Sequence, residues 1–157
     1  MIYYQSKTAV ARSAEFGDIA KLKDSLRDST VEEIRVLYDF TSEDSLTYSF
    51  LNSSFCYSIV AGDEVIAMGG IYKSMNVDKA RIWFLSSNKL DKIERTFLRQ
   101  CKVFISSMLD LCPLLYNYVD ERNKPAMAWL KWIGAEFGDT IHLKTKPMRY
   151  FEFRNKV

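Results

Sequence analysis

The segment "VDERNKPAMAWLKWIGAEF" at residues 119–137 constrains the fold of this chain more than any other stretch. Asn123 is a favoured N-cap residue, and Pro125 falls in the first helical turn, where its missing N–H is not needed. Gly134 supplies the positive φ that commonly ends a helix, and Phe137 then opens a strand. The segment therefore predicts a short capped helix between two strands. Its apolar residues share one helical face: Ala126, Trp129, Leu130 and Ile133.

The segment from Asn88 to Asp110 is expected to form the longest helix. Its apolar residues repeat at intervals of four, four, three and four, which is typical of a helix with one buried face: Ile93, Phe97, Cys101, Phe104 and Met108. The runs "ARIWFLSS" before it and "LLYNYV" after it are expected strands. This strand–helix–strand step at 80–119 predicts a parallel crossover. Upstream, "FCYSIV" and "EVIAMGGIY" enclose the dipeptide Gly62–Asp63 and predict a β-hairpin.

The remaining segments complete the expected fold. "MIYYQSKTA" and "MRYFEF" are the expected first and last strands. Helices are expected over "ARSAEFGDIAKLKDSLRD", over "VEEIRVLYDF" with a capping box between Thr30 and Glu33, and over "TSEDSLTYSFLNSS". Together these elements predict one α/β (α+β) domain over residues 1–157, with roughly four helices and a mixed, mostly antiparallel twisted sheet of about six to seven strands.

The composition narrows the functional classes. A net charge of +2 is too small to argue for a nucleic-acid or membrane-surface protein. No apolar run is long enough to predict a membrane span, and the first residues lack the regions of an export signal. Cys56, Cys101 and Cys112 show no CxxC spacing, so we expect reduced thiols in a cytosol-like compartment. The one histidine, His142, leaves too few ligands for a metal site.

The helix of the segment 119–137 also follows a longer pattern. Five residues match "N-x-x-A-x-x-[L/F]-Y-x-K-x-G-F" in spacing: Asn123, Ala126, Trp129, Leu130 and Gly134. With the hairpin, the third strand and the long helix before it, the chain resembles the GNAT acyltransferase superfamily from its first strand through "MRYFEF". The resemblance implies a GNAT-like fold, and an acetyl-CoA-dependent acetyl transfer if the chemistry is kept.

A narrower resemblance covers "YNYVDERNKPAMAWLKWIGAEF", with "WFLSS" and "ERTFLRQCKVFISSM" before it. Nine residues fit its pattern: Asn117, Val119, Asn123, Met127, Trp129, Leu130, Lys131, Ile133 and Gly134. The chain looks like a family of small GNAT-like internal virion or morphogenesis proteins of short-tailed lytic phages. That resemblance implies a protein that acts in virion assembly or binds phage or host proteins, in the host cytoplasm or associated with the virion.

The GNAT resemblance also implies a place for the cofactor. Such enzymes carry a glycine-rich loop between the fourth strand and the long helix, where backbone N–H groups hold pyrophosphate. Here "SSNKLDKIER" contains no glycine. If acetyl-CoA or CoA binds, the implied residues are Leu85, Ser86, Ser87, Lys89, Lys92 and Asn123. Lys89 and Lys92 are equally explained by a solvated turn, and Asn123 by helix capping.

The resemblance implies a general acid and a base as well. The tyrosine of the acyltransferase pattern is replaced by Leu130, which cannot donate a proton. Tyr116 or Tyr118 could substitute, and strand alternation points both the same way. Glu152 is the nearest candidate base, although an alternating strand favours a solvent-facing role. The sequence leaves two hypotheses, a catalytically degenerate binding protein and an N-acetyltransferase with a divergent loop, and favours the first.

A row of cations follows the expected long helix. Lys92, Arg95, Arg99 and Lys102 are spaced three, four and three residues apart, opposite the apolar stripe. A solvated helix face explains them, and so does a surface for an anionic partner. Because the whole chain is close to neutral, a protein partner is favoured over nucleic acid.

Overall fold

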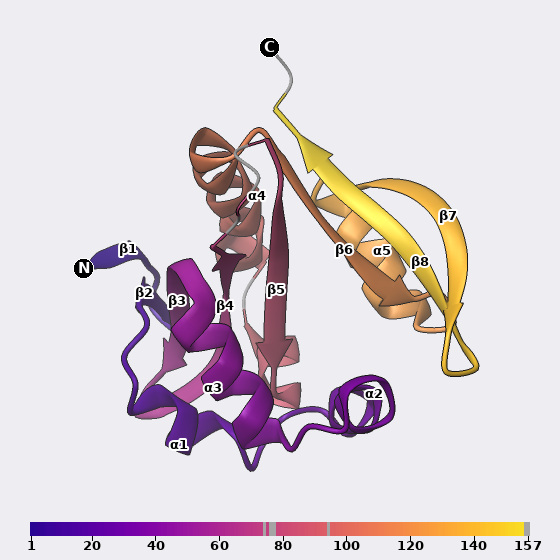
Figure 1. Cartoon of the computed structure of the whole chain (residues 1–157). Coiled ribbons are helices and arrows are strands. Elements are labelled where there is room, and N and C mark those ends of the chain that lie inside the picture. Colours follow the sequence, from indigo (N-terminus) through magenta and orange to yellow (C-terminus); the bar gives the residue numbers. More distant parts are fainter. Residues whose placement is uncertain (74, 76–77, 94, 156–157) are drawn as a thin grey trace. The chain divides into compact units, whose positions relative to one another are not determined.

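The computed structural model describes residues 1–73, 75, 78–93 and 95–155 (Figure 1). The elements in chain order are β1 (Ile2–Gln5), β2 (Val10–Ser13), α1 (Asp18–Leu22), α2 (Asp28–Tyr38), α3 (Ser42–Asn52), β3 (Ser53–Ala61), β4 (Glu64–Tyr72), β5 (Ala80–Ser86), the 3₁₀ helix η1 (Asn88–Lys92), α4 (Arg95–Leu111), β6 (Leu114–Asp120), α5 (Lys124–Trp132), β7 (Glu136–Leu143) and β8 (Lys146–Arg154).

The strands follow the order β1-β2-β3-β4-β5-β6-β8-β7. β5 and β6 pair in parallel, which confirms the predicted crossover through the long helix. The pairs β1–β2, β2–β3, β3–β4, β6–β8 and β7–β8 are antiparallel. The mixed, mostly antiparallel α/β fold is confirmed, with eight strands and five α-helices in the described chain, slightly more than expected.

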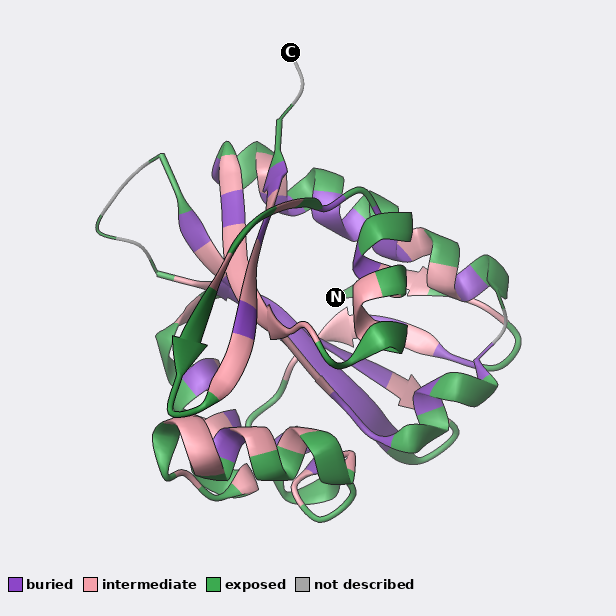
Figure 2. Cartoon of the chain, turned by 90° about the vertical axis from the view of Figure 1, so that its right-hand side faces the viewer, coloured by how far each residue is buried: buried purple, intermediate pink, exposed green. Residues whose placement is uncertain are grey.

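The chain forms two compact units. Unit 1 comprises Met1–Lys73 and Trp83–Leu98, and unit 2 comprises Ser74–Ile82 and Arg99–Val157. The core of unit 1 gathers buried residues from α1, α2, α3, β4 and β5, with Leu22, Leu46 and Met68 fully buried. Unit 2 buries residues of α4, β6, α5 and β8 and the C-cap of α5 (Figure 2), namely Phe104, Ile105, Met108, Leu115, Leu130, Ile133, Phe151 and Phe153. The single domain expected over 1–157 stays a prediction.

The additional strand lies near the N-terminus. The expected helix over residues 11–28 is wrong before Asp18 and after Leu22, because Val10–Ser13 pairs with Tyr57–Val60 of β3 and Leu26 forms a β-bridge with Ser87. A turn separates β1 from β2, in which Ser6 Oγ accepts hydrogen bonds from the N–H groups of Thr8 and Ala9 at 3.3 and 3.2 Å. Strand pairing therefore overrides the helical spacing of this stretch.

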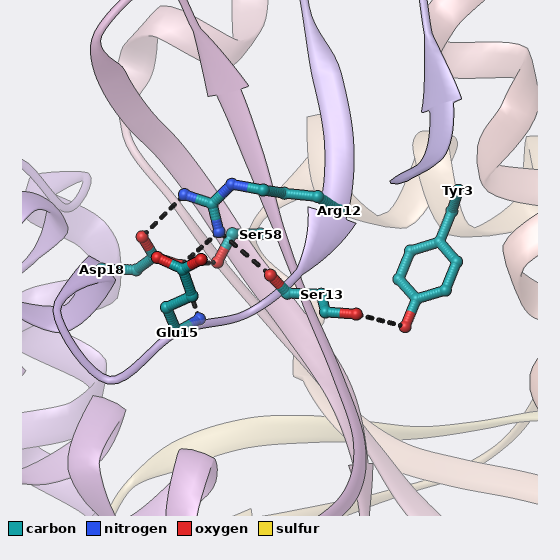
Figure 3. A network of polar contacts seen from close by, with 6 residues as sticks. All are labelled: Tyr3, Arg12, Ser13, Glu15, Asp18 and Ser58. Atoms are coloured by element: carbon teal, nitrogen blue, oxygen red, sulfur yellow. Dashed lines mark hydrogen bonds and ion pairs between the residues drawn. The ribbon is translucent and has the colours of Figure 1, made fainter. Parts of the chain in front are cut away.

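A buried ion pair explains why α1 begins at Asp18 (Figure 3). Arg12 donates two hydrogen bonds of 2.9 Å to the Asp18 carboxylate, Ser58 Oγ donates a third at 2.7 Å and Glu15 N–H a fourth at 2.8 Å. Asp18 is 1% exposed. Its burial raises the pKa of Asp18, but the bonds from Arg12, Glu15 and Ser58 outweigh burial, so this pKa lies below its usual value. The network joins β2, β3 and α1 within unit 1.

The helices before the hairpin begin at other residues than expected. α2 starts at Asp28 with Arg27 as its N-cap, so the capping box expected between Thr30 and Glu33 is wrong. A capping box does form at α3. There Asp44 N–H donates to Thr41 Oγ1 at 3.0 Å, and Thr41 N–H donates to the Asp44 carboxylate at 3.4 Å.

The long helix expected from Asn88 to Asp110 is interrupted near its beginning. Residues 88–92 form η1, Ile93 is extended with φ −78° and ψ 139°, and α4 begins at Arg95. Both Leu90 and Ile93 are buried, so the interruption leaves neither apolar side chain exposed. The expected stripe is buried throughout: Ile93, Phe97, Cys101, Phe104 and Met108.

Candidate functional site

Arg27, the N-cap residue of α2, binds the segment 85–92, where the resemblance places a pyrophosphate loop. The Arg27 guanidinium donates to both Asp91 carboxylate oxygens at 2.6 and 3.2 Å, and its Nε donates to Ser86 Oγ at 3.1 Å. Arg27 N–H also donates to the Ser86 carbonyl at 3.1 Å. The hydrogen bonds from Arg27 lower the pKa of Asp91. A carboxylate of this chain therefore holds the guanidinium at the end of β5.

The backbone N–H groups of the same segment also have acceptors inside the protein. Ser87 N–H donates to the Ile66 carbonyl at 2.9 Å, and Lys89 N–H to Ser87 Oγ at 3.3 Å. Leu90 N–H donates to the Ser87 carbonyl at 3.3 Å, and Ile93 N–H to the Leu90 carbonyl at 3.1 Å. Phosphate sites at helix N-termini use N–H groups that are free to bind the anion, whereas these four donors already have acceptors within the chain.

The side chains proposed for cofactor binding in unit 1 differ in exposure. Ser86 and Ser87 are buried, and Leu85 is half-buried. Lys89 forms an ion pair with Glu64 of β4, while Lys92 is exposed. The structure thus brings together four of the five residues, 85–87 and 89, at the end of β5, and each of these four has a contact within the protein.

Asn123 acts as the N-cap that the sequence predicts. Its Oδ1 accepts a hydrogen bond from Ala126 N–H at 3.2 Å, and the side chain is exposed. Gly134 has φ +108° and ends α5 as expected. Leu130, at the position of the acyltransferase tyrosine, is 8% exposed, and the Ala135 N–H donates to its carbonyl at 3.0 Å. At this position the chain therefore has a packed apolar side chain.

In unit 2 the structure brings together three candidates for acid–base chemistry. Tyr116 lies opposite Glu152 in the β6–β8 ladder, and Tyr118 lies opposite Tyr150. Cross-strand partners share one face of a sheet, so both tyrosines lie with Glu152 on one side, as strand alternation predicted for the tyrosines. The Tyr150 ring is 6.1 Å from that of Tyr116 and 5.5 Å from that of Tyr118.

Glu152 is less exposed than the alternating pattern suggested, because β8 lies between β6 and β7 rather than at the edge of the sheet. Its side chain is 15% exposed and forms an ion pair with Arg154. Burial, followed by the charge of Glu152, raises the pKa of Tyr150. The three phenols and the carboxylate form one compact cluster.

Cations border this tyrosine cluster. Arg81 faces Tyr116 across the β5–β6 ladder, with its guanidinium carbon 5.4 Å from the ring centroid, and Lys79 Nζ lies 5.2 Å from the same centroid. Asn117 lies where this parallel ladder ends. Its side-chain nitrogen donates to the Ile82 carbonyl at 2.6 Å, and its oxygen accepts from Tyr118 N–H at 2.8 Å.

The cationic row proposed for partner binding is shorter than expected. Arg95, Arg99 and Lys102 lie on α4 and are exposed, but Lys92 belongs to η1 and loses the helical spacing. Lys102 Nζ lies 4.8 Å from the ring centroid of Trp132 on α5. Sequence reasoning missed this contact, and it missed Arg27 and Asp91, because no local pattern links residues so far apart in the chain.

In the part of the chain that the structure describes, no group of three or more His, Cys, Asp or Glu side chains is placed to hold a metal ion. The described helices include none long and apolar enough to span a membrane.

The strand order, the parallel β5–β6 step through α4 and the capped α5 define a GNAT-type fold. The chain is similar to a GNAT-family acetyltransferase from Bacillus anthracis, with 13% identity, 98% of each chain covered and a TM-score of 0.68. It is also similar to a spermidine N-acetyltransferase from Vibrio cholerae, solved with CoA and spermine, at 12% identity, 95% and 96% coverage and a TM-score of 0.67.

A third similar structure is the ribosomal-protein-S5-alanine acetyltransferase from Vibrio fischeri, with 12% identity, 97% and 96% coverage and a TM-score of 0.67. Residues 56–141, more than half of the chain, match the profile of the family described as "Bacteriophage T7, probable scaffold protein Gp13". The chain belongs to this phage protein family. The expected GNAT fold and the resemblance to small phage proteins are both confirmed, while the search of curated proteins gave no match.

Proposed function

We propose that this protein is a catalytically degenerate GNAT-fold phage protein that acts in virion assembly by binding protein partners. The observation that carries the proposal is the closed segment 85–92: its Asp91 holds Arg27, and four backbone N–H groups, three in the segment and that of Ile93 next to it, have internal acceptors. The family, described as a probable scaffold protein, supports an assembly role. In this proposal the fold serves as a binding module, since one fold hosts many functions.

The segment 85–92 fits a pyrophosphate poorly. The Asp91 carboxylate would repel the anion, and the lysine nearest to it in sequence, Lys89, is paired with Glu64. Freeing the four N–H groups would break four hydrogen bonds, each worth about 1 kcal/mol. With Leu130 packed in the core, the helix α5 also offers no phenol to protonate a leaving thiolate. Both features support a loss of catalysis.

Calorimetry with acetyl-CoA and with CoA tests the cofactor half of the proposal. We expect no heat and no thermal shift at millimolar ligand, and no transfer of labelled acetyl groups to amine acceptors. An active GNAT enzyme in the same assay controls for reagent quality. The proposal would be contradicted if the chain transferred acetyl groups and the transfer fell when Lys89 and Lys92 were replaced by alanine. Specific binding without turnover would indicate instead a pseudoenzyme that senses the cofactor.

The binding half of the proposal uses the exposed cations of α4. Arg95, Arg99 and Lys102 would face an anionic surface of a phage or host protein, with Lys92 nearby in sequence. The protein would then act in the host cytoplasm and could remain with the virion. Quantifying this chain in purified particles against infected-cell extract distinguishes a particle component from an assembly factor. Replacing the three α4 cations by glutamate should lower particle yield, whereas unchanged yield would contradict the proposal.

A second candidate function is an acetyl-CoA-dependent N-acetyltransferase with a divergent loop. The observation in its favour is the cross-strand pair Tyr116–Glu152, which places a phenol and a carboxylate together in unit 2. The similarity to a structure solved with CoA adds to it. This candidate predicts that Tyr116→Phe or Glu152→Gln lowers acetyl transfer at least tenfold, about 1.4 kcal/mol of transition-state stabilisation. If the chain transfers no acetyl group, this second candidate function is excluded.

A further inference from the structure

The charge of this chain is unevenly divided between its units. Unit 2 carries 12 Lys and Arg against 7 Asp and Glu, a formal charge of +5, while unit 1 carries 10 against 13, a charge of −3. These values add to the net +2 of the chain, which hides the division. A positive excess confined to one unit provides a local field that attracts anionic partners.

Part of the positive excess of unit 2 lies on two of its helices. Residues 99–109 of α4 and 124–132 of α5 contain four cations and no Asp or Glu. All four are exposed: Arg99, Lys102, Lys124 and Lys131. Within residues 1–73, 75, 78–93 and 95–155, no ion pair joins any of them to a carboxylate. The first acidic residue after Arg99 on α4 is Asp110, about 12 Å along the helix axis from Lys102.

An aromatic contact joins the two helices on this surface. Lys102 Nζ lies 4.8 Å from the Trp132 ring centroid, so α4 and α5 are neighbours here. Trp132 is 45% exposed, and Val103, next to Lys102, is 54% exposed. Tryptophan and arginine are the side chains most enriched among residues that dominate the energy of protein interfaces. Exposed apolar area beside unpaired cations is what an acidic segment with an apolar anchor would cover.

We propose that Arg99, Lys102, Val103, Lys131 and Trp132, the α4–α5 surface, dock an acidic segment of a partner protein that carries an apolar anchor. The inference rests on the proposed binding function and adds the chemistry of the partner. The anchor packs against Trp132 and Val103, and carboxylates of the segment pair with the cations around them. Specificity comes from the apolar contact, and the rate of encounter from the charge.

The observations favour a protein over a nucleic acid. Lys102 occupies one face of the Trp132 ring, which leaves at most the other face for a stacked base. Exposed Val103 adds apolar area that a phosphate backbone would leave uncovered. A nucleic acid would also track the cations alone, so its affinity would follow charge and be insensitive to the removal of the indole.

Fluorescence anisotropy with two labelled probes tests the inference on the full chain. One probe is a synthetic 16-residue peptide of Glu and Leu, and the other is single-stranded oligo-dT of the same net charge. We expect the peptide to bind, with affinity reduced about tenfold or more by Lys102→Glu with Lys131→Glu and about fivefold or more by Trp132→Ala. The control is Lys7→Glu with Lys144→Glu, which changes the net charge equally at two exposed sites outside the surface. The control should stay within about twofold of the original affinity.

Melting curves establish that each variant is folded. If a surface variant does not fold, the milder substitutions Lys102→Gln and Trp132→Phe are measured in its place. Equal losses in the control and in the surface variants would overturn the inference, as would an unchanged affinity for Trp132→Ala. Tighter binding of oligo-dT than of the peptide would assign the surface to nucleic acid. The peptide assay does not depend on acetyl-CoA, so the two proposals can fail separately. A chain that proves to be an acetyltransferase can still bind the peptide. A chain that binds no cofactor can still fail to bind the peptide.

Discussion

Arg27 and Asp91 form a two-pronged ion pair between residues 64 positions apart, with guanidinium–carboxylate distances of 2.6 and 3.2 Å. The pair joins the N-cap of α2 to η1 within unit 1. Because the same guanidinium also donates to Ser86 Oγ at 3.1 Å, it closes the segment after β5 from two directions. The proposed loss of cofactor binding rests on this pair, because the GNAT resemblance implies a phosphate loop at the same place.

Replacing either partner of this ion pair should cost little stability. Asp91 is mostly exposed, so Asp91→Asn is expected to lower the free energy of unfolding by about 0.5–1 kcal/mol. Arg27→Ala also loses the bonds to Ser86 and should cost about 1–2 kcal/mol. Urea denaturation of both variants and of the double variant measures the coupling. A loss above about 3 kcal/mol for Asp91→Asn would show that the pair is far less solvated than its exposure indicates.

The buried Asp18 should make this protein sensitive to acid. Asp18→Asn leaves Arg12 without its anionic partner and is expected to cost about 3–5 kcal/mol. The folded-state pKa of Asp18 is lowered, so its contribution is present above the unfolded-state pKa of about 3.9 and is lost as pH falls through the lower folded-state pKa.

Denaturation curves measured between neutral pH and pH 2 check this sign. The original chain should lose stability below about pH 4, and Asp18→Asn should show a flatter pH dependence there. The matched control is the exposed Asp24→Asn, which should keep the original slope. A steep acid loss that survives in Asp18→Asn would place the responsible carboxylate elsewhere.

Local sequence patterns were enough to predict the elements that are determined by residues close together in the chain. The stripe from Phe97 to Met108 and the cap at Asn123 with its stop at Gly134 depend on residues within one helix, and the structure contains each. The Gly62 turn likewise lies between strands that pair directly, and Gly62 has φ +61°. Periodicity and turn chemistry act over a few residues, so the sequence displays them.

The elements that were missed depend on distant partners. Val10–Ser13 pairs with β3, and this pairing overrode a helical spacing. The pairs Arg27–Asp91 and Lys102–Trp132 join residues far apart in the chain, and neither leaves a local signal. For the candidate site, alternation placed Tyr116 and Tyr118 on one face, but only the β6–β8 register shows that Glu152 lies with them.

Gly70 lies where β3 and β4 approach closely. A Cβ at this position would meet the Phe55 carbonyl oxygen at 2.1 Å, and this oxygen belongs to backbone that cannot turn away. Gly70→Ala should therefore cost about 2–4 kcal/mol in urea denaturation. Gly17→Ala is the control, because its Cβ would meet nothing within 4 Å and its φ of −63° suits alanine. Similar stability of the two variants would contradict the close approach.

Leu130→Tyr tests whether the tyrosine missing from the acyltransferase pattern could restore chemistry. Leu130 is buried, so the larger phenol should overpack unit 2 and cost about 1–3 kcal/mol. We expect no acetyl transfer, since the closed segment 85–92 is unchanged. Leu130→Met keeps the volume and should cost less than about 1.5 kcal/mol. A Leu130→Tyr chain that is fully stable and transfers acetyl groups would show that only the acid had been lost.

The free thiols of half-buried Cys56 and buried Cys101 should react slowly. Burial raises the pKa of Cys56 to about 12 and that of Cys101 to about 11. Since the thiolate is the nucleophile, alkylation of both at pH 8 should be at least about a hundredfold slower than for a thiol of pKa 8.5. Mass spectrometry of iodoacetamide-treated protein follows each residue, and the chain unfolded in urea is the control. Rapid labelling of Cys101 in the folded chain would show that α4 opens readily from the core of unit 2.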